Sequence, residues 1–175
     1  MVRSSYTHVS ITAADLDESV EFYEDVFGLE QIPTPNWNLP VQWLAVDGLQ
    51  LHLVETEANV PEFHHFALHV DDLEHVYTSV VEHPTAAVEE LDQYVDRTGS
   101  GEAPPVYYLP NGTVQLYVRD PNGTMIEVDY PDVEDLDPAV VTNTVERDDL
   151  QPPEPGEEAG DIYGEYGFDL DAFEA

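Results

Sequence analysis

Four residues of the types that bind metal ions lie at equivalent positions of an internal sequence repeat. His8 and His65 each open the first strand expected in one half of the repeat. His52 and Glu127 lie in the last strand expected in each half, where they align with one another. Imidazole and carboxylate groups together suit Fe(II), Mn(II), Ni(II) or Zn(II). We therefore predict a metal site, provided that a pseudo-twofold axis between the halves brings these side chains together.

The repeat also predicts the elements that must position these side chains. Residues 8–16 align with residues 65–73, and residues 41–48 align with residues 114–120. In both copies a strand-like segment leads into apolar residues at helical spacing. Two or three segments of alternating apolar and polar residues follow, and this alternation is typical of half-buried strands. Each half is thus expected to run strand, helix, then antiparallel strands.

These observations predict an α+β fold with two βαβββ modules, over residues 5–57 and 62–131, within one domain of residues 1–131. The modules are expected to form one curved mixed sheet around a metal-binding cleft, with the helices outside. Asp15 and Asp72 precede the two helical stripes. Because Asp is a preferred N-cap residue, we expect these two side chains to begin the helices.

Three regions fall outside the repeat. Residues 86–95 are predicted to form an extra helix, and residues 98–105 a loop. Residues 132–175 are predicted to be an acidic, largely irregular tail, because Asp, Glu and Pro become dense there. Residues 162–168 of this tail interleave aromatic and acidic side chains. Two interpretations stay open: these aromatics dock on the body or on a partner subunit, or they belong to a loose solvating tail.

The composition is strongly acidic, with 38 Asp and Glu against 4 Lys and Arg and a formal net charge of −34. This charge excludes electrostatic binding to nucleic acid or to an anionic membrane, because both need clustered Lys and Arg side chains. Because molar salt screens such repulsion, we expect a halophilic protein, with an acidic mesophilic protein as the alternative. No cysteine is present, and no apolar run approaches a membrane span, so a soluble cytoplasmic protein is expected.

Residues 5–131 resemble the vicinal oxygen chelate superfamily, which includes glyoxalase I, bleomycin- and fosfomycin-resistance proteins and extradiol dioxygenases. The resemblance is carried by His8-Val9-Ser10-Ile11, Asp15-Leu16, Phe22-Tyr23, Phe27-Gly28-Leu29, His65-Phe66-Ala67-Leu68, Arg119-Asp120-Pro121-Asn122-Gly123 and Ile126-Glu127. It implies metal ligands at His8, His65 and Glu127, with His52 at the fourth position. Glyoxalase I looks to have a glutamate at that fourth position, so the histidine here disfavours glyoxalase I chemistry.

Residues 116–127 resemble the C-terminal half of the extradiol dioxygenase signature. That resemblance implies that Glu127 is an iron ligand and Tyr117 a nearby phenol. The histidine that the signature asks for upstream is absent, and the window holds Tyr108 instead. A dioxygenase would then take its proton shuttle from His69 or Tyr108. Apolar walls of the site are expected from four aromatic residues, namely Trp37, Trp43, Phe66 and Tyr107.

The leading hypothesis is a divalent-metal-dependent enzyme, ring-cleaving-dioxygenase-like, for a small substrate with vicinal oxygens. A glyoxalase-type lyase or isomerase is one alternative, and a non-catalytic small-molecule-binding resistance protein is the other. Fe2+ or Mn2+ is favoured as the metal, with Zn2+ or Ni2+ as alternatives. The expected partners are a small-molecule substrate and a second copy in a homodimer, with no nucleic acid and no membrane. Whether the site lies in one chain or is shared by two stays open.

Overall fold

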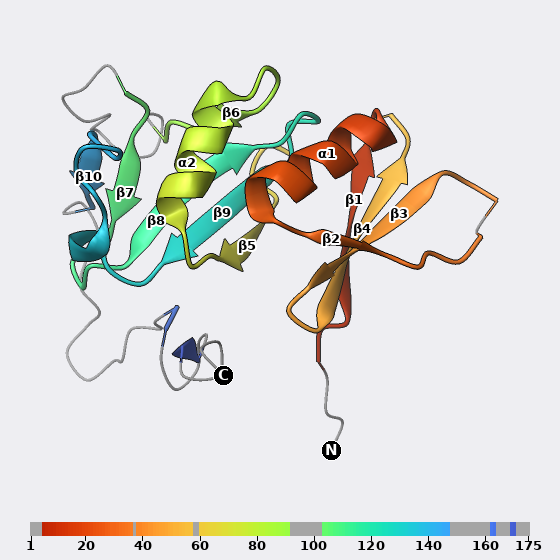
Figure 1. Ribbon diagram of the computed structural model, residues 1–175, viewed down its shortest axis with the longest axis horizontal. Helices are drawn as coiled ribbons and strands as arrows, with labels where there is room; N and C mark the ends of the chain where they lie inside the picture. The colour runs from red at the N-terminus through yellow and green to blue at the C-terminus, as the bar shows by residue number, and fades with distance from the viewer. Residues whose placement is uncertain are drawn as a thin grey trace.

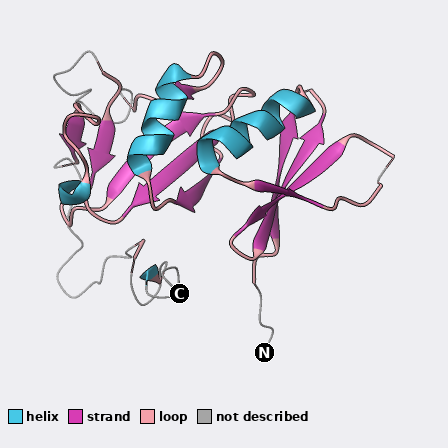
Figure 2. Cartoon of the chain, in the orientation of Figure 1, coloured by secondary structure: helices cyan, strands magenta, loops and turns pink. Residues whose placement is uncertain are grey.

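A computed structural model describes residues 5–36, 38–57, 60–91, 103–147, 162–163 and 169–170. The chain has the predicted α+β architecture, with two sheets that each carry one long helix (Figures 1 and 2). Each sheet is mixed and belongs to one module, so the hydrogen bonds form two sheets where one continuous sheet was expected. No helix among the described residues is long and apolar enough to cross a membrane.

Module one has the predicted order of strand, helix and three strands. Its elements are β1 (His8–Ala13), α1 (Leu16–Phe27), β2 (Glu30–Ile32), β3 (Val41–Val46) and β4 (Leu49–Glu55). The strands lie in the order β1-β4-β3-β2, and only β1 runs parallel to its neighbour. The side chain of Asp15 accepts a hydrogen bond from the backbone N–H of Glu18, so the predicted N-cap of α1 is confirmed. Gly28 ends α1 in the left-handed conformation at φ 63°.

Module two repeats this plan with one interruption. Its elements are β5 (His65–His69), α2 (Leu73–Glu82), β6 (Ala87–Val88), β7 (Val106–Tyr108), β8 (Val114–Arg119) and β9 (Met125–Tyr130). The order β5-β9-β8-β7 matches the order of module one. Both β6 and β7 pair with β8, at opposite ends of that strand. Together they take the place of β2. The side chain of Asp72 accepts from the N–H of His75, so the second predicted N-cap is also confirmed.

Strand register confirms the predicted alignment of β1 with β5 and of β4 with β9, but it shifts the alignment of β3 with β8 by one residue. Trp43 lies opposite His52 and Tyr117 lies opposite Glu127, so Trp43 matches Tyr117, where the predicted alignment of residues 41–48 with 114–120 pairs it with Leu116. In module one Ser10, two residues after His8, lies opposite His52. In module two Ala67, two residues after His65, lies opposite Glu127. The two predicted pairs therefore occupy the same places in their sheets.

The helix predicted over residues 86–95 is not formed in the part of that segment that the structure describes. Ala87 and Val88 form β6, and residues 89–91 have no regular structure. The backbone N–H of Glu89 donates to the carbonyl of Tyr117 at 2.7 Å. Long-range pairing with the edge of β8 thus satisfies backbone groups that a helix would have satisfied locally. Residues 92–95 and the first part of the predicted 98–105 loop lie outside the described residues.

The first part of the C-terminal extension is more ordered than its composition predicts. A short 3-10 turn (Val133–Asp135) is followed by β10 (Thr144–Glu146), which lies parallel to β7. Leu136 and Val141 are buried in the main hydrophobic core. The apolar residues between the acidic ones therefore pack against the core, and their burial offsets the loss of conformational entropy when this acidic segment becomes ordered.

The two modules are held together where the β8–β9 turn meets α1. The phenol of Tyr23 in α1 donates to Asp120 Oδ2 at 3.0 Å, and both residues are buried. The side-chain oxygen of Asn122 accepts from the N–H of Ala14, and its amide donates to Ser19 at 2.8 Å. Burial raises the pKa of the Asp120 carboxyl, although hydrogen bonds from its three neighbours Thr124, Tyr23 and Asn122 oppose that shift. These contacts fix one module against the other across about a hundred residues of sequence.

Candidate metal centre

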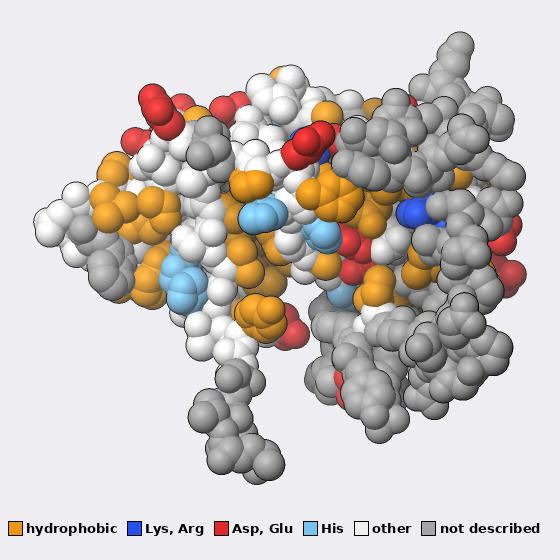
Figure 3. All heavy atoms as spheres, turned by 180° about the vertical axis from the view of Figure 1, so that it is seen from behind, with side chains coloured by type: hydrophobic (Ala, Val, Ile, Leu, Met, Phe, Trp, Pro, Cys, Tyr) orange, Lys and Arg blue, Asp and Glu red, His pale blue; other side chains and the backbone are white. Residues whose placement is uncertain are grey.

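One face of the module-two sheet carries most of the polar residues predicted to do chemistry. Alternation along β9 turns Ile126 and Val128 into the core, toward α2, and leaves Glu127 and Asp129 on the other face. His65 lies on the same face of the neighbouring strand β5. Seen from behind, the molecule shows histidine side chains among apolar and acidic ones on this side (Figure 3).

His65 and Glu127 face each other at a distance typical of two ligands of one ion. His65 Nε2 lies 3.0 Å from Glu127 Oε2. His65 Nδ1 lies 3.1 Å from the carbonyl oxygen of Phe63, which can only accept, so Nδ1 carries the proton. In neutral imidazole the lone pair of Nε2 then points at a carboxylate oxygen, and two such acceptors need a cation or a proton between them. Two ligands at right angles on an ion with bonds of about 2.1 Å lie about 3.0 Å apart. The pair therefore fits a divalent metal.

The carboxylate of Glu127 lies among polar side chains. Gln115 Nε2 donates to Glu127 Oε1, and the Tyr117 phenol and the Asp129 carboxyl lie close enough for the charge of Glu127 to act on both. Burial, followed by the charges of Glu127 and Asp129, raises the pKa of the Tyr117 phenol well above its usual range. Burial and the charge of Glu127 raise the pKa of Asp129 to about 7. Such partners orient a ligand and keep its charge in place.

The module-one pair has a different arrangement. The rings of His8 and His52 stack at 4.3 Å and 11°, and His52 stacks on Trp43 at 4.3 Å and 4°. Gln50 Oε1 lies 2.8 Å from His52 Nε2, and Thr7 Oγ1 lies 3.0 Å from His8 Nδ1. Burial, and then the neighbouring His8, lower the pKa of His52. Because the lone pairs lie in the ring planes, two nearly parallel rings hold them in separate planes, so these two imidazoles do not converge on one point.

The structure brings the four predicted ligands together as two pairs, not as one cluster. No group of three or more metal-type side chains occurs within the residues that the structure describes. His8, His52 and Trp43 line a cavity of about 500 Å³ on module one. His65 lines a different cavity of about 270 Å³, where β1 and β5 approach each other. The single cleft expected from the pseudo-twofold repeat is thus divided in this chain, because each pair belongs to a separate sheet.

The three predicted catalytic residues lie at different places relative to the candidate site. Tyr117 lies beside Glu127, with its ring centroid 6.5 Å from that of His65. His69 lies four residues after His65 on the same face of β5, and its Nδ1 is 2.9 Å from the Tyr163 hydroxyl. Tyr108 packs against the main core and reaches Glu146, so the structure places it away from the candidate site. Alternation puts Tyr107, not Tyr108, on the side of Tyr117.

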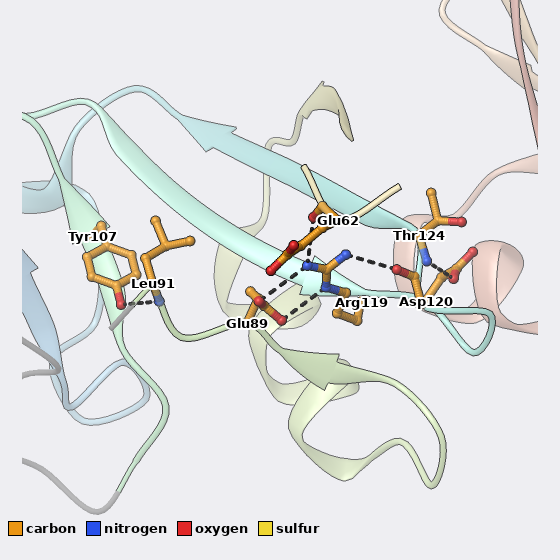
Figure 4. Close-up of polar contacts among 8 residues, drawn as sticks. Glu62, Glu89, Leu91, Tyr107, Arg119, Asp120 and Thr124 are labelled. Carbon is orange, nitrogen blue, oxygen red and sulfur yellow. Dashed lines mark hydrogen bonds and ion pairs between the residues drawn. The ribbon is translucent and has the colours of Figure 1, made fainter. Parts of the chain in front are cut away.

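The predicted apolar walls are only partly found. Trp43 lines the module-one cavity, while Phe66 lines the cavity between β1 and β5 and packs against the core. Tyr107 is fully buried, and its hydroxyl accepts from the N–H of Leu91 at 2.9 Å (Figure 4). Trp37 lies outside the described residues.

Sequence analysis missed three residues around this face: Gln115, Asp129 and Tyr163. Alternation along β9 was the available signal for Asp129, because it shares the face of Glu127. Gln115 lies directly opposite Asp129 in the register of β8 and β9. Docking of the aromatics of residues 162–168 on the body was one of the two interpretations left open, but the partner of Tyr163 lies 94 positions away and no local pattern predicts it.

Two modules of this topology, with a histidine and a carboxylate at matched places, define a glyoxalase-type fold. Residues 5–128 match the Glyoxalase/Bleomycin resistance protein/Dioxygenase superfamily, and the chain belongs to it. No curated protein matches the chain.

Solved structures share the fold at low sequence identity. Oxidase ChaP-H2 is 20% identical, with a TM-score of 0.55 over 73% of this chain and 94% of that chain. A glyoxalase-related enzyme from Fulvimarina pelagi is 15% identical, with a TM-score of 0.50 over 73% and 88%. Lactoylglutathione lyase from Agrobacterium tumefaciens is 26% identical, with a TM-score of 0.47 over 73% and 93%. The likenesses to Oxidase ChaP-H2 and to the Fulvimarina pelagi enzyme concern the fold alone.

Proposed function

We propose that this chain is a divalent-metal-dependent enzyme that acts on a small substrate with vicinal oxygens, in the manner of an extradiol ring-cleaving dioxygenase. The observation that carries the proposal is the facing pair of His65 Nε2 and Glu127 Oε2, 3.0 Å apart. The hydrogen bond from His65 Nδ1 to a backbone carbonyl supports it, because metal-binding histidines commonly carry such a contact on their other nitrogen. Fe2+ or Mn2+ is the metal that we favour.

Neighbouring residues of the chain would orient the metal ligands. When bound, the metal supplies a Lewis acid that chelates two neighbouring substrate oxygens and stabilises the charge that develops on them. Gln115 holds the Glu127 carboxylate by a hydrogen bond, and the Tyr117 phenol lies beside it. Tyr117 keeps its proton, because burial raises the pKa of its phenol, so it can donate a hydrogen bond.

The charge around the site favours a neutral or phenolic substrate over an anionic thiol adduct. The face carries the carboxyls of Glu127 and Asp129. The guanidinium of Arg119 on the neighbouring strand contacts Glu89 twice, at 3.0 and 3.3 Å, and also two backbone carbonyls (Figure 4). This cation is therefore already paired within the chain. A second cation, Arg147, lies close enough to Tyr117 to oppose the rise in the pKa of its phenol. The carboxyls of Glu127 and Asp129 on the same face support the dioxygenase-like alternative over the glyoxalase-like one.

We further propose that a homodimer completes the metal site. Two histidines and one carboxylate form a sufficient set of ligands, and the third ligand would be His8 of a second copy. Its Nδ1 contacts Thr7, which leaves Nε2 for the metal. His52 would then position the His8 ring by stacking on it and would not itself bind the metal. The separation of the two pairs within one chain supports this arrangement.

Elemental analysis of the wild-type protein tests the proposed function. Protein purified in high salt, without chelator or a metal-affinity tag, is expected to hold about one iron or manganese per chain. It should consume oxygen with catechol, as an oxygen electrode measures, and dialysis against a chelator should abolish that activity. Nickel or zinc with no oxygen uptake would favour the lyase or isomerase alternative. No bound metal, and none taken up on addition, would refute a metal enzyme.

Mixing two inactive variants tests whether the site is shared. His8→Ala and His65→Ala chains, unfolded together and refolded at equal amounts, would form mixed dimers in which one of two shared sites is intact. About a quarter of the wild-type metal content is then expected in the mixture. The two variants refolded separately and then combined without exchange provide the control. A mixture with no more metal than the separate variants would show that subunits do not share the site.

A further inference from the structure

The C-terminal extension returns to the face that carries the candidate metal ligands. The Tyr163 hydroxyl lies 2.9 Å from His69 Nδ1. The two rings also meet edge to face, with centroids 5.5 Å apart and planes at 80°. Tyr163 is half-buried. A hydrogen bond combined with an aromatic contact is a specific docking arrangement, because it constrains both the position and the tilt of the ring.

His69 belongs to the same row of side chains as His65. Leu68 and Val70 pack against the core, so alternation turns His69 to the opposite face of β5. Asp129 lies opposite His69 in the register of β5 and β9, two residues beyond Glu127. The charge of Asp129 acts on the Tyr163 phenol and, together with burial, raises its pKa above the usual range. Tyr163 therefore lies at the end of the row that Glu127 begins.

A second part of the extension covers the other side of the same face. Val145 in β10 forms a small apolar cluster with Leu91 and Tyr107, and Tyr117 packs against this cluster. The backbone N–H of Arg147 donates to the carbonyl of Tyr108 at 2.8 Å, which continues the pairing of β10 with β7. The extension thus touches the face at Tyr117 and again at His69, on either side of Glu127.

We propose that β10 and Tyr163 form a built-in wall of the candidate site, in which Tyr163 docks on His69 and positions its imidazole beside the bound substrate. As a claim about substrate, this inference rests on the proposed function. Tyr163 is a positioning residue here, because it acts on the site through His69. The wall presents an aromatic ring and a neutral hydroxyl next to two carboxyls, which suits a planar phenolic substrate.

Chemical modification of His69 tests the docking without any metal. Metal-free full-length protein in high salt would be treated with diethyl pyrocarbonate, and the modification rate of each histidine followed by peptide mass spectrometry. His69 should react severalfold faster in Tyr163→Ala than in the wild type, and at an intermediate rate in Tyr163→Phe, which keeps the ring but loses the hydroxyl. His75, which lies on helix α2, is the internal reference. An unchanged His69 rate in Tyr163→Ala would overturn the docking.

Ligand binding tests the wall itself, with 4-nitrocatechol as the chromophoric probe on metal-loaded protein. Loss of the aromatic contact in Tyr163→Ala should raise the Kd of the probe about tenfold, without loss of metal. Tyr6→Ala is the matched control, since Tyr6 is 84% exposed near the other end of the chain. An unchanged or a lower Kd in Tyr163→Ala would overturn the wall. Failure of the wild type to bind metal would refute the proposed function instead, and the His69 rates would still decide the docking.

Discussion

The His65→Ala variant is expected to lose its bound metal while it keeps its fold. Substitutions at the partners of metal ligands commonly cost about 10–100-fold in metal affinity, so loss of the ligand itself should cost at least about 100-fold. His65 is partly exposed, and its polar side-chain contacts are one backbone carbonyl and Glu127. The rings of Phe63 and Tyr117 meet it only edge-on, with ring centroids 6.4 and 6.5 Å away. Its removal therefore leaves the core intact. Metal content measured by elemental analysis, together with far-UV circular dichroism in high salt, checks both halves of this expectation.

Two further variants distinguish loss of metal binding from loss of the fold: one replaces a histidine outside the site, and the other replaces the second proposed ligand. His75→Ala removes an imidazole from α2, on the other side of the sheet, and should retain full metal content. Glu127→Gln keeps an oxygen to accept from Gln115 but removes the charge beside Tyr117 and Asp129. Its metal-free form should be at least as stable as the metal-free wild type, yet fail to bind metal. Full metal content in either His65→Ala or Glu127→Gln would contradict the proposed site.

The folded state is expected to be lost as salt is removed. With a formal net charge of −34 on 175 residues, the surface is strongly self-repulsive. The Debye length grows from about 3 Å at 1 M salt to about 30 Å at 0.01 M, so charges that are screened at high salt repel one another across the whole domain in dilute buffer. Circular dichroism during stepwise dilution of salt should show a cooperative loss of structure that is reversed when salt is restored.

The identity of the salt provides the control for this expectation. NaCl and KCl should support folding equally at equal ionic strength, because general screening does not depend on which monovalent cation is present. A large difference between the two salts would point to specific ion binding. Unchanged structure and unchanged thermal stability in dilute buffer would contradict the halophilic interpretation and favour an acidic protein that tolerates its charge.

Short-range patterns in the sequence were sufficient to predict most of the scaffold. Asp15 and Asp72 each accept a hydrogen bond from the backbone N–H three residues ahead and so cap the helix that follows. The period of two along β5 and β9 places His65 and Glu127 on one face. These features depend on neighbours within a few positions along the chain. The sequence similarity of the two halves also predicted that both have the same order of strands and helix, because the same local patterns occur in each.

Long-range contacts account for the features that the sequence could not predict. Ala87 and Val88 pair with the edge of β8 rather than form a helix, since pairing with residues about thirty positions away satisfies their backbone. In the three-residue strand β7, alternation alone could not tell whether Tyr107 or Tyr108 would face Tyr117. The docking of Tyr163 on His69 likewise depends on where the extension crosses the sheet.

The sequence by itself determined the family, the two-module plan and the residue types of the candidate metal centre. Each of these is encoded in local patterns that recur in both halves. Only the tertiary structure decided that His65 meets Glu127 while His8 meets His52, and that Tyr163 returns to the same face. The physical reason is that the packing of two separate sheets sets which equivalent side chains converge, and this packing depends on contacts between residues far apart in the chain.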